Sequence, residues 1–194
     1  MRKWFRRALL VGVALPLVGL AFVFSIGLVR AWPVVGPNGW NPASFFTSED
    51  MLRFYELPDL AKDAARKGDF DEARERAEEL LEIAPKFPNN WNFGNAIHDS
   101  HVVLGLVALS DDDLAAARSH LIAAGQTTGS PQLDTFGPNM MLAEALLKRG
   151  ETKVVLDYFE LCRSFWEMDD GRLAAWSIEA SGGKVPCFGA NLRY

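Results

Sequence analysis

The chain has 194 residues, of which 49% are hydrophobic and 23% charged, and a formal net charge of −5 at pH 7. This length predicts one globular domain with a targeting segment. Residues 1–30 contain five basic residues and no acidic one, so the other 164 residues hold 15 basic and 25 acidic residues, a formal charge of −10. An acidic body argues against nucleic acid as a partner, because phosphates are bound by Lys and Arg.

The N-terminal segment predicts a membrane anchor. Residues 8–29, ALLVGVALPLVGLAFVFSIGLV, are 22 residues without a charge. At about 1.5 Å per residue, a helix of this length spans about 33 Å and can cross a bilayer. The basic start at residues 1–7 should stay cytoplasmic, which places the rest of the chain on the extracytoplasmic (periplasmic or equivalent) side. A cleaved signal peptide is the alternative, although signal cores are usually shorter, at about 7–15 residues.

Residues 30–46 follow as a linker, since prolines, glycines and asparagines interrupt any regular pattern there. Thr47 or Ser48 can cap a short helix over 48–56, and Pro58 is expected to interrupt the helical pattern. From this point apolar residues recur every three and four positions, which is the period of an α-helix. No strand is predicted.

Three windows, at 60–85, 104–129 and 142–167, share one spacing of residues. Each window begins with Leu and a small residue, and a turn residue follows seven positions after the small one. A small or β-branched residue comes five positions after the turn residue, and an apolar residue comes four positions after that. The small residues are Ala61, Gly105 and Ala143, and the turn residues are Gly68, Asp112 and Gly150. The small or β-branched residues are Ala73, Ala117 and Val155, and the apolar residues are Ala77, Leu121 and Phe159. The spacing predicts helical hairpins, because the small residues allow close helix packing and glycine ends a helix at little cost.

This pattern resembles the tetratricopeptide repeat (TPR), a helix–turn–helix unit of 34 residues. The resemblance covers about residues 54–169, and Pro85 falls where such a repeat ends. The turns lie 44 and 38 residues apart, which indicates insertions near 88–97 and 132–135.

The resemblance implies an all-α fold for residues 47–183. We expect about three antiparallel helical hairpins, stacked as a short TPR-like solenoid and preceded by one transmembrane helix. A capping helix over 169–183, with Asp170 as its N-cap, should close the array. The apolar tail at 184–194 is expected to fold back on the domain.

Two of the three histidines, His98 and His101, lie three residues apart in the stretch GNAIHDSHVVLG (94–105). This is a usable metal-ligand spacing on a helix, but a site needs at least a third ligand. The alignment places His120 away from the face of its helix that meets the preceding one. We therefore expect a partly buried histidine with a hydrogen-bonded neighbour, and a metal- or histidine-dependent enzyme centred on His98 and His101 is the alternative. A pH-sensing role is a third reading.

No catalytic residue, metal or other cofactor is indicated elsewhere, since the chain has no nucleophile elbow, P-loop or dinucleotide glycine pattern. The loop at 126–139, which contains Ser130, is long enough to be a binding loop or a folded insert. Cys162 and Cys187 are too few for a disulfide scaffold, although the two could pair.

Members of the TPR family usually bind a peptide or protein in a groove lined by the first helix of each hairpin. The resemblance implies the groove residues Tyr55, Lys62, Arg66, Asp99, Val102, Leu106, Met140, Glu144 and Lys148. Burial of Val102, Leu106 and Met140 in the core is the alternative. The clamp that some members use for a partner's C-terminal carboxylate looks absent.

The expected function is that of a membrane-anchored, non-catalytic scaffold or adapter. It would bind a protein partner through the groove and the membrane through residues 8–29, and would assemble or organise a membrane-associated complex. An accessory subunit whose membrane helix makes the main contacts is a further possibility.

Overall fold

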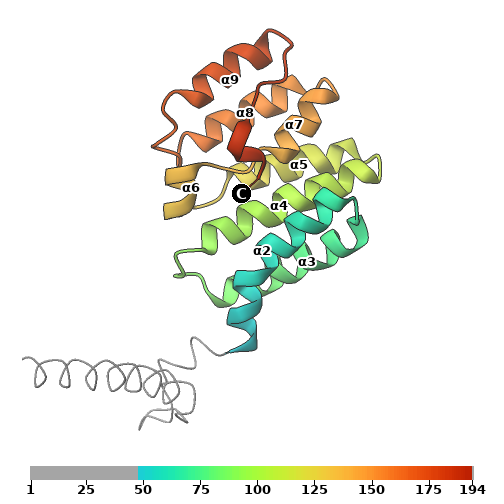
Figure 1. Ribbon diagram of the computed structural model, residues 1–194, viewed down its shortest axis with the longest axis vertical. Coiled ribbons are helices and arrows are strands. Elements are labelled where there is room, and N and C mark those ends of the chain that lie inside the picture. Colours follow the sequence, from blue (N-terminus) through green and yellow to red (C-terminus); the bar gives the residue numbers. More distant parts are fainter. Residues whose placement is uncertain (1–47, 194) are drawn as a thin grey trace, which may run out of the picture. The chain divides into compact units, whose positions relative to one another are not determined.

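The computed structural model describes residues 48–193 (Figure 1). In this part of the chain there are eight α-helices, two short 3-10 segments and no strand, so the expected all-α class is confirmed. The helices are α2 (Glu49–Lys67), α3 (Phe70–Ile83), α4 (Phe93–Ser110), α5 (Leu114–Gly125), α6 (Pro131–Phe136), α7 (Met141–Lys148), α8 (Thr152–Cys162) and α9 (Arg172–Ser181), and the 3-10 segments are η2 (Ala84–Lys86) and η3 (Gly189–Leu192).

The predicted membrane segment at 8–29 lies outside the described residues, as do the basic start at 1–7 and the linker at 30–46. None of the helices between residues 48 and 193 has the length and apolar character that crossing a membrane requires.

Helix α2 continues through Pro58, contrary to the expected interruption. Proline has no N–H group to bond the carbonyl of Phe54, which costs the helix one hydrogen bond. Phe54, Leu57 and Ala61 are all buried on either side of it, and this packing outweighs the loss. The short helix predicted over 48–56 is therefore only the first half of α2.

The three predicted turn residues adopt the same backbone conformation. Gly68, Asp112 and Gly150 have φ values of +78°, +59° and +82°, all in the left-handed region. They follow the ends of α2, α4 and α7 and lead into α3, α5 and α8. The carboxylates of Asp69 and Asp113 then accept hydrogen bonds from backbone N–H groups in the first turns of α3 and α5.

The helices form hairpins that pack on their neighbours in chain order (Figure 1). Helix α2 packs on α3, α4 contacts both, and α5 joins α4 to α8. Eight of the small and apolar residues that the shared spacing picked out are almost fully buried: Ala61, Ala73, Ala77, Ala117, Leu121, Ala143, Val155 and Phe159. A Cβ atom at Gly105 would lie 2.2 Å from the Cδ2 atom of Leu142, so this glycine lets α7 approach α4.

The C-terminal helix begins one residue later than the predicted N-cap implies. Asp170 is not its N-cap, because Gly171 holds that position with φ +77°. The carboxylate of Asp169 instead accepts a hydrogen bond from the backbone N–H of Leu173, at 3.0 Å. The additional left-handed residue, Asp170 at φ +51°, delays the start of α9.

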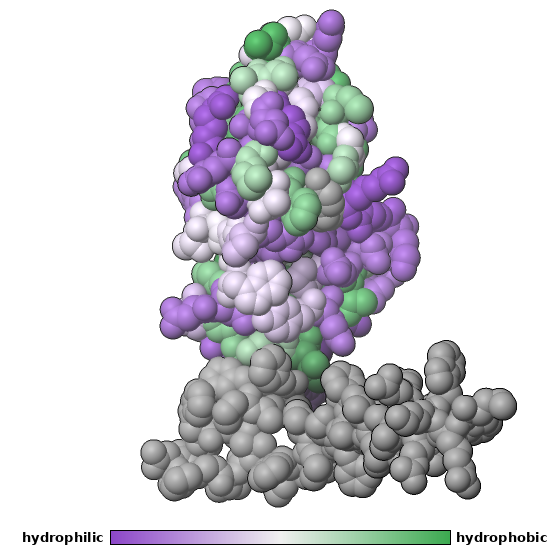
Figure 2. Space-filling model, turned by 60° about the vertical axis from the view of Figure 1, so that its left-hand side comes forward, coloured by the Kyte–Doolittle hydropathy of each residue, from purple (hydrophilic) through white to green (hydrophobic). Residues whose placement is uncertain are grey.

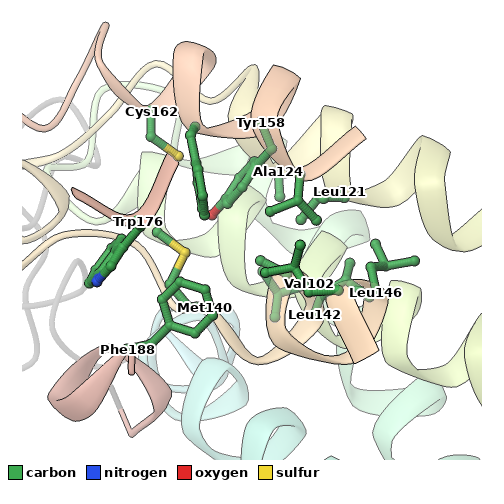
Figure 3. Close-up of a cluster of buried hydrophobic side chains, with 14 of the residues drawn as sticks. Val102, Leu121, Ala124, Met140, Leu142, Leu146, Tyr158, Cys162, Trp176 and Phe188 are labelled. Atoms are coloured by element: carbon green, nitrogen blue, oxygen red, sulfur yellow. The ribbon is translucent and has the colours of Figure 1, made fainter. Parts of the chain in front are cut away.

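The C-terminal tail folds back into the helical domain. Phe188 is buried and packs edge-to-face on Trp176, with ring centroids 4.9 Å apart. Figure 3 shows Phe188 beside Met140 within the cluster of buried apolar side chains. The buried Asn191 donates from its amide to the carbonyls of Phe136 and Pro138, and its own carbonyl accepts from the Met140 N–H group. The tail is therefore part of the packed domain.

Candidate functional site

A pocket of about 170 Å³ opens between α2, the α3–α4 connection, α4 and α6. It is lined by Tyr55, Pro58, Asp59, Lys62, Trp91, Asn92, Asn95, Asp99 and Gln132. Pockets for cofactors and drug-sized ligands usually measure about 300–1,000 Å³. The volume therefore suits one amino-acid side chain or a group of similar size.

The floor of the pocket is a buried ion pair. The Lys62 ammonium of α2 lies 2.8 Å from the Asp99 carboxylate of α4, and their side chains are only 4% and 11% exposed. The Nδ1 atom of the fully buried His98 lies 3.0 Å from the second Asp99 oxygen. Its Nε2 atom lies 3.0 Å from the hydroxyl of Tyr158 on α8. A chain of polar contacts thus runs from the pocket into the core.

Burial and ion pairing shift the pKa values of Lys62 and Asp99 in opposite directions. Burial alone would lower the pKa of Lys62, but the neighbouring Asp99 and then Asp59 outweigh it, and the pKa is raised. Burial would likewise raise the pKa of Asp99, but Lys62 and His98 hold it below its ordinary value. Both groups are therefore charged near neutral pH, and each depends on the other.

One wall of the pocket is an amide network centred on Asn95. The side-chain nitrogen of Asn95 donates to Asn92 Oδ1 at 2.6 Å and to Gln132 Oε1 at 2.8 Å. Its oxygen accepts from the Ser130 hydroxyl at 2.6 Å. Asn95 thereby holds α6 against α4 and fixes the orientation of the two other amides. No residue between 48 and 193 accepts from Asn92 Nδ2 or Gln132 Nε2, so both donors are open to a ligand.

The rim of the pocket is aromatic and acidic. The rings of Tyr55 and Trp91 lie with centroids 6.0 Å apart and planes inclined by 32°. Trp91 is 58% exposed, which is unusual for so large an apolar side chain. Asp59, whose side chain is 85% exposed, lies 3.3 Å from the Lys62 ammonium. Figure 2 shows one face of the molecule, on which hydrophilic and hydrophobic residues are interspersed.

The stretch GNAIHDSHVVLG begins where the loop before α6 meets α4. A Cβ atom at Gly94 would lie 1.8 Å from the carbonyl oxygen of Gly129, so only glycine allows the two backbones to meet. The Thr127 hydroxyl donates to the Gly94 carbonyl at 2.8 Å and fixes the same contact. This junction places Ser130 and Gln132 beside Asn95. The sequence 126–139 is thus a folded insert that completes the pocket.

Three of the predicted groove residues come together in the pocket, namely Tyr55, Lys62 and Asp99. Arg66 lies further along α2 and donates to Asp63 and to the backbone carbonyl of Arg193 in the tail.

The other five predicted groove residues do not line the pocket. Val102 and Met140 are fully buried in the core, and Leu106 is partly buried against it, which is the alternative that the sequence left open. Glu144 and Lys148 form an i,i+4 ion pair at 2.8 Å along α7.

The two histidines of the alternative site contact different partners. His98 faces Asp99 and Tyr158, whereas the Nδ1 atom of His101 lies 3.1 Å from Nδ1 of His120 on α5. His120 therefore does lie on the face of α5 that meets α4, contrary to the alignment. Burial, and then the neighbouring His120, lower the pKa of His101 to about 4. No three His, Cys, Asp or Glu side chains between residues 48 and 193 are grouped to hold a metal ion.

The two cysteines do not pair. Both are free thiols, with Cys162 buried on α8 and Cys187 exposed in the tail. Burial raises the pKa of the Cys162 thiol, which makes it unreactive.

Sequence reasoning missed most of the pocket lining, namely Pro58, Asp59, Trp91, Asn92, Asn95 and Gln132. The available signal was the run NNWNFGN at 89–95, near the predicted insertion, where four asparagines and a tryptophan accompany the first turn of a helix. Gln132 carried no such signal, because its role depends on where α6 docks.

Comparisons with known protein families, with curated proteins and with solved structures found no match to this chain.

Proposed function

We propose that this protein is a membrane-anchored TPR-like adapter that binds a protein partner and helps to assemble or organise a membrane-associated complex. The TPR-like arrangement is supported by the left-handed turns at Gly68, Asp112 and Gly150 and by the burial of the small residues at the matching helix positions. The anchor is proposed at residues 8–29, with residues 1–7 cytoplasmic and the helical domain extracytoplasmic.

The pocket between α2 and α4 is the observation that carries the proposal. It lies between the first helices of two successive hairpins, where TPR-like proteins bind their partners. Its floor is fixed by the ion pair between Lys62 and Asp99, and its wall by the amide network of Asn95. A pocket with rigid polar groups and a volume close to that of one side chain suits an anchor residue of a partner protein.

The C-terminal tail restricts the rest of the groove. Its backbone contacts Arg66 at Arg193 and Met140 at Asn191, and Phe188 packs beside Met140. The first helix of the third hairpin is therefore partly covered by the chain itself. Partner contacts should concentrate on α2, α4 and α6, so the functional residues are Tyr55, Lys62, Trp91, Asn92, Asp99 and Gln132.

The test is co-isolation of the full-length protein from its native membranes, with quantitative mass spectrometry of wild type and variants. Trp91→Ala removes an exposed side chain of the rim and should deplete one specific protein by at least about tenfold. Ile178→Ala on α9, also an exposed apolar residue, is the matched control and should leave that protein unchanged. Equal co-isolation by all three forms would contradict a partner site at this pocket.

Replacing residues 8–29 by an unrelated membrane helix separates the adapter from the accessory-subunit possibility. An adapter that binds through its domain keeps its partner after this exchange. Loss of the partner in a correctly inserted protein would show that the membrane helix makes the contacts.

A further inference from the structure

The two opposite charges in the floor of the pocket cancel each other. Lys62 and Asp99 are bound to each other at 2.8 Å and are almost fully buried. Asp59 is the remaining charged group of the lining, and its side chain is 85% exposed at the mouth of the pocket. A ligand that enters therefore meets a negative charge first, on a body whose formal charge is −10 over residues 31–194.

The aromatic rim complements that charge. A cation is attracted to the face of a Trp or Tyr ring, and Trp91 and Tyr55 stand side by side at the pocket with a carboxylate beside them. The same protein contains such an arrangement elsewhere. The guanidinium of Arg172 lies 4.9 Å from the Trp166 ring centroid and also bonds Asp170 at 3.2 Å.

We infer that the pocket binds a basic side chain, arginine or lysine, carried by an extended segment of the partner protein. The inference rests on the proposed function and names the chemistry of the residue that enters the pocket. The cation lies against Trp91 and Tyr55 and pairs with Asp59. A volume of about 170 Å³ accommodates one such side chain.

The amide wall selects a peptide over a free amine. Asn92 is only 7% exposed, and neither its Nδ2 atom nor Gln132 Nε2 finds an acceptor among residues 48–193. Both amides line the pocket, so a ligand that supplies acceptors there can take a hydrogen bond from each. The backbone carbonyls that flank a basic residue in a peptide provide these acceptors, whereas a free polyamine has none.

An acidic ligand is disfavoured by the same geometry. A carboxylate would approach Asp59 and Asp99 and would have to compete with both for Lys62. This distinguishes the pocket from a clamp for a partner's C-terminal carboxylate.

The test is a selection of random 12-residue peptides on the full-length protein in detergent micelles, with counter-selection on Trp91→Ala. We expect the selected peptides to share one arginine or lysine. The best peptide should lose at least about tenfold in affinity when citrulline replaces that arginine, or glutamine that lysine. The Asp59→Asn variant should lose affinity to a similar extent, and Ile178→Ala should not. Both substituted rim residues are exposed, so these variants should fold.

The possible results distinguish a failure of the basic-side-chain inference from a failure of the proposed function. Peptides that require Trp91 but show no basic preference, or that bind equally well after the citrulline or glutamine replacement, would overturn the inference and leave the proposed function standing. Peptides enriched in Asp or Glu would overturn it as well. A selection in which no peptide depends on Trp91 would overturn both claims.

Discussion

The Lys62 ammonium lies 2.8 Å from the Asp99 carboxylate and links the first helices of two successive hairpins. The pair forms the floor of the pocket and also begins the polar chain that continues through His98 to Tyr158. Because both charges are buried, neither is stable without the other. The same contact therefore supports the fold and shapes the candidate site.

Lys62→Met should destabilise the protein by about 3–5 kcal/mol, because it leaves the buried carboxylate of Asp99 without its counter-ion. Urea denaturation of the full-length protein in detergent, followed by circular dichroism, measures this loss. The control is Lys153→Met, which breaks an exposed i,i+4 pair with Asp157 and should cost less than about 0.5 kcal/mol. Equal losses in the two variants would contradict a stabilising role of the buried pair.

Gly94→Ala should destabilise the protein by about 1–3 kcal/mol through overpacking. The added Cβ atom would lie 1.8 Å from the Gly129 carbonyl oxygen, and backbone must move to relieve the clash. Since this contact docks the segment that carries Ser130 and Gln132, we also expect faster hydrogen exchange over residues 127–136. Gly182→Ala, whose Cβ atom would have ordinary space, is the control. Unchanged exchange in Gly94→Ala would show that the junction does not hold α6.

The hairpins could be predicted from sequence because they depend on neighbouring residues. Turns at Gly68 and Gly150 need only a residue that accepts positive φ at the end of a helical pattern. Asp112 was found through the shared spacing, and aspartate tolerates this conformation better than most residues. The small residues of the helix interfaces followed from the same alignment.

The pocket could be predicted only in part because it depends on contacts between distant segments. Tyr55, Lys62 and Asp99 followed from the family resemblance, but Asn95 meets Gln132 across 37 residues of the chain. That contact exists because two glycines allow the backbones at 94 and 129 to touch, which no periodicity reveals. The tail likewise covers Met140 through a non-local contact.

Stability should fall as pH falls from about 6.5 toward about 4, in part through His101. Burial and the neighbouring His120 lower its pKa from 6.5 to about 4 in the folded protein, and the pKa of His120 is lowered too. In this window the unfolded chain binds protons that the folded chain does not, so the free energy of unfolding decreases.

The measurement compares urea denaturation at pH 7 and pH 5 for wild type and His101→Gln. Between the two pH values, the free energy of unfolding of wild type should fall by about 1 kcal/mol more than that of the variant. The difference is this small because His101 is only partly buried, and solvent screens its interactions. The carboxylates titrate in both proteins and cancel in the comparison. A variant with the same pH dependence as wild type would contradict this role.

The exposed Cys187 offers a direct test of the proposed topology. A membrane-impermeant maleimide should label intact cells at Cys187, because the helical domain is proposed to be extracytoplasmic, while the buried Cys162 stays unlabelled. Cys187→Ser should abolish the label. Labelling that requires permeabilised cells would place the domain on the cytoplasmic side and refute the proposed orientation.

The central claim, that a partner protein enters the pocket, is tested most directly by site-specific photo-crosslinking in native membranes. Probes replace Tyr55, Trp91 and Gln132 in turn, and control probes replace the half-buried Arg74 and the exposed Ile178. We expect the three pocket positions to give an adduct with one and the same protein and the two controls to give none. Adducts at the controls alone, or no adduct at any pocket position in folded and inserted protein, would contradict it.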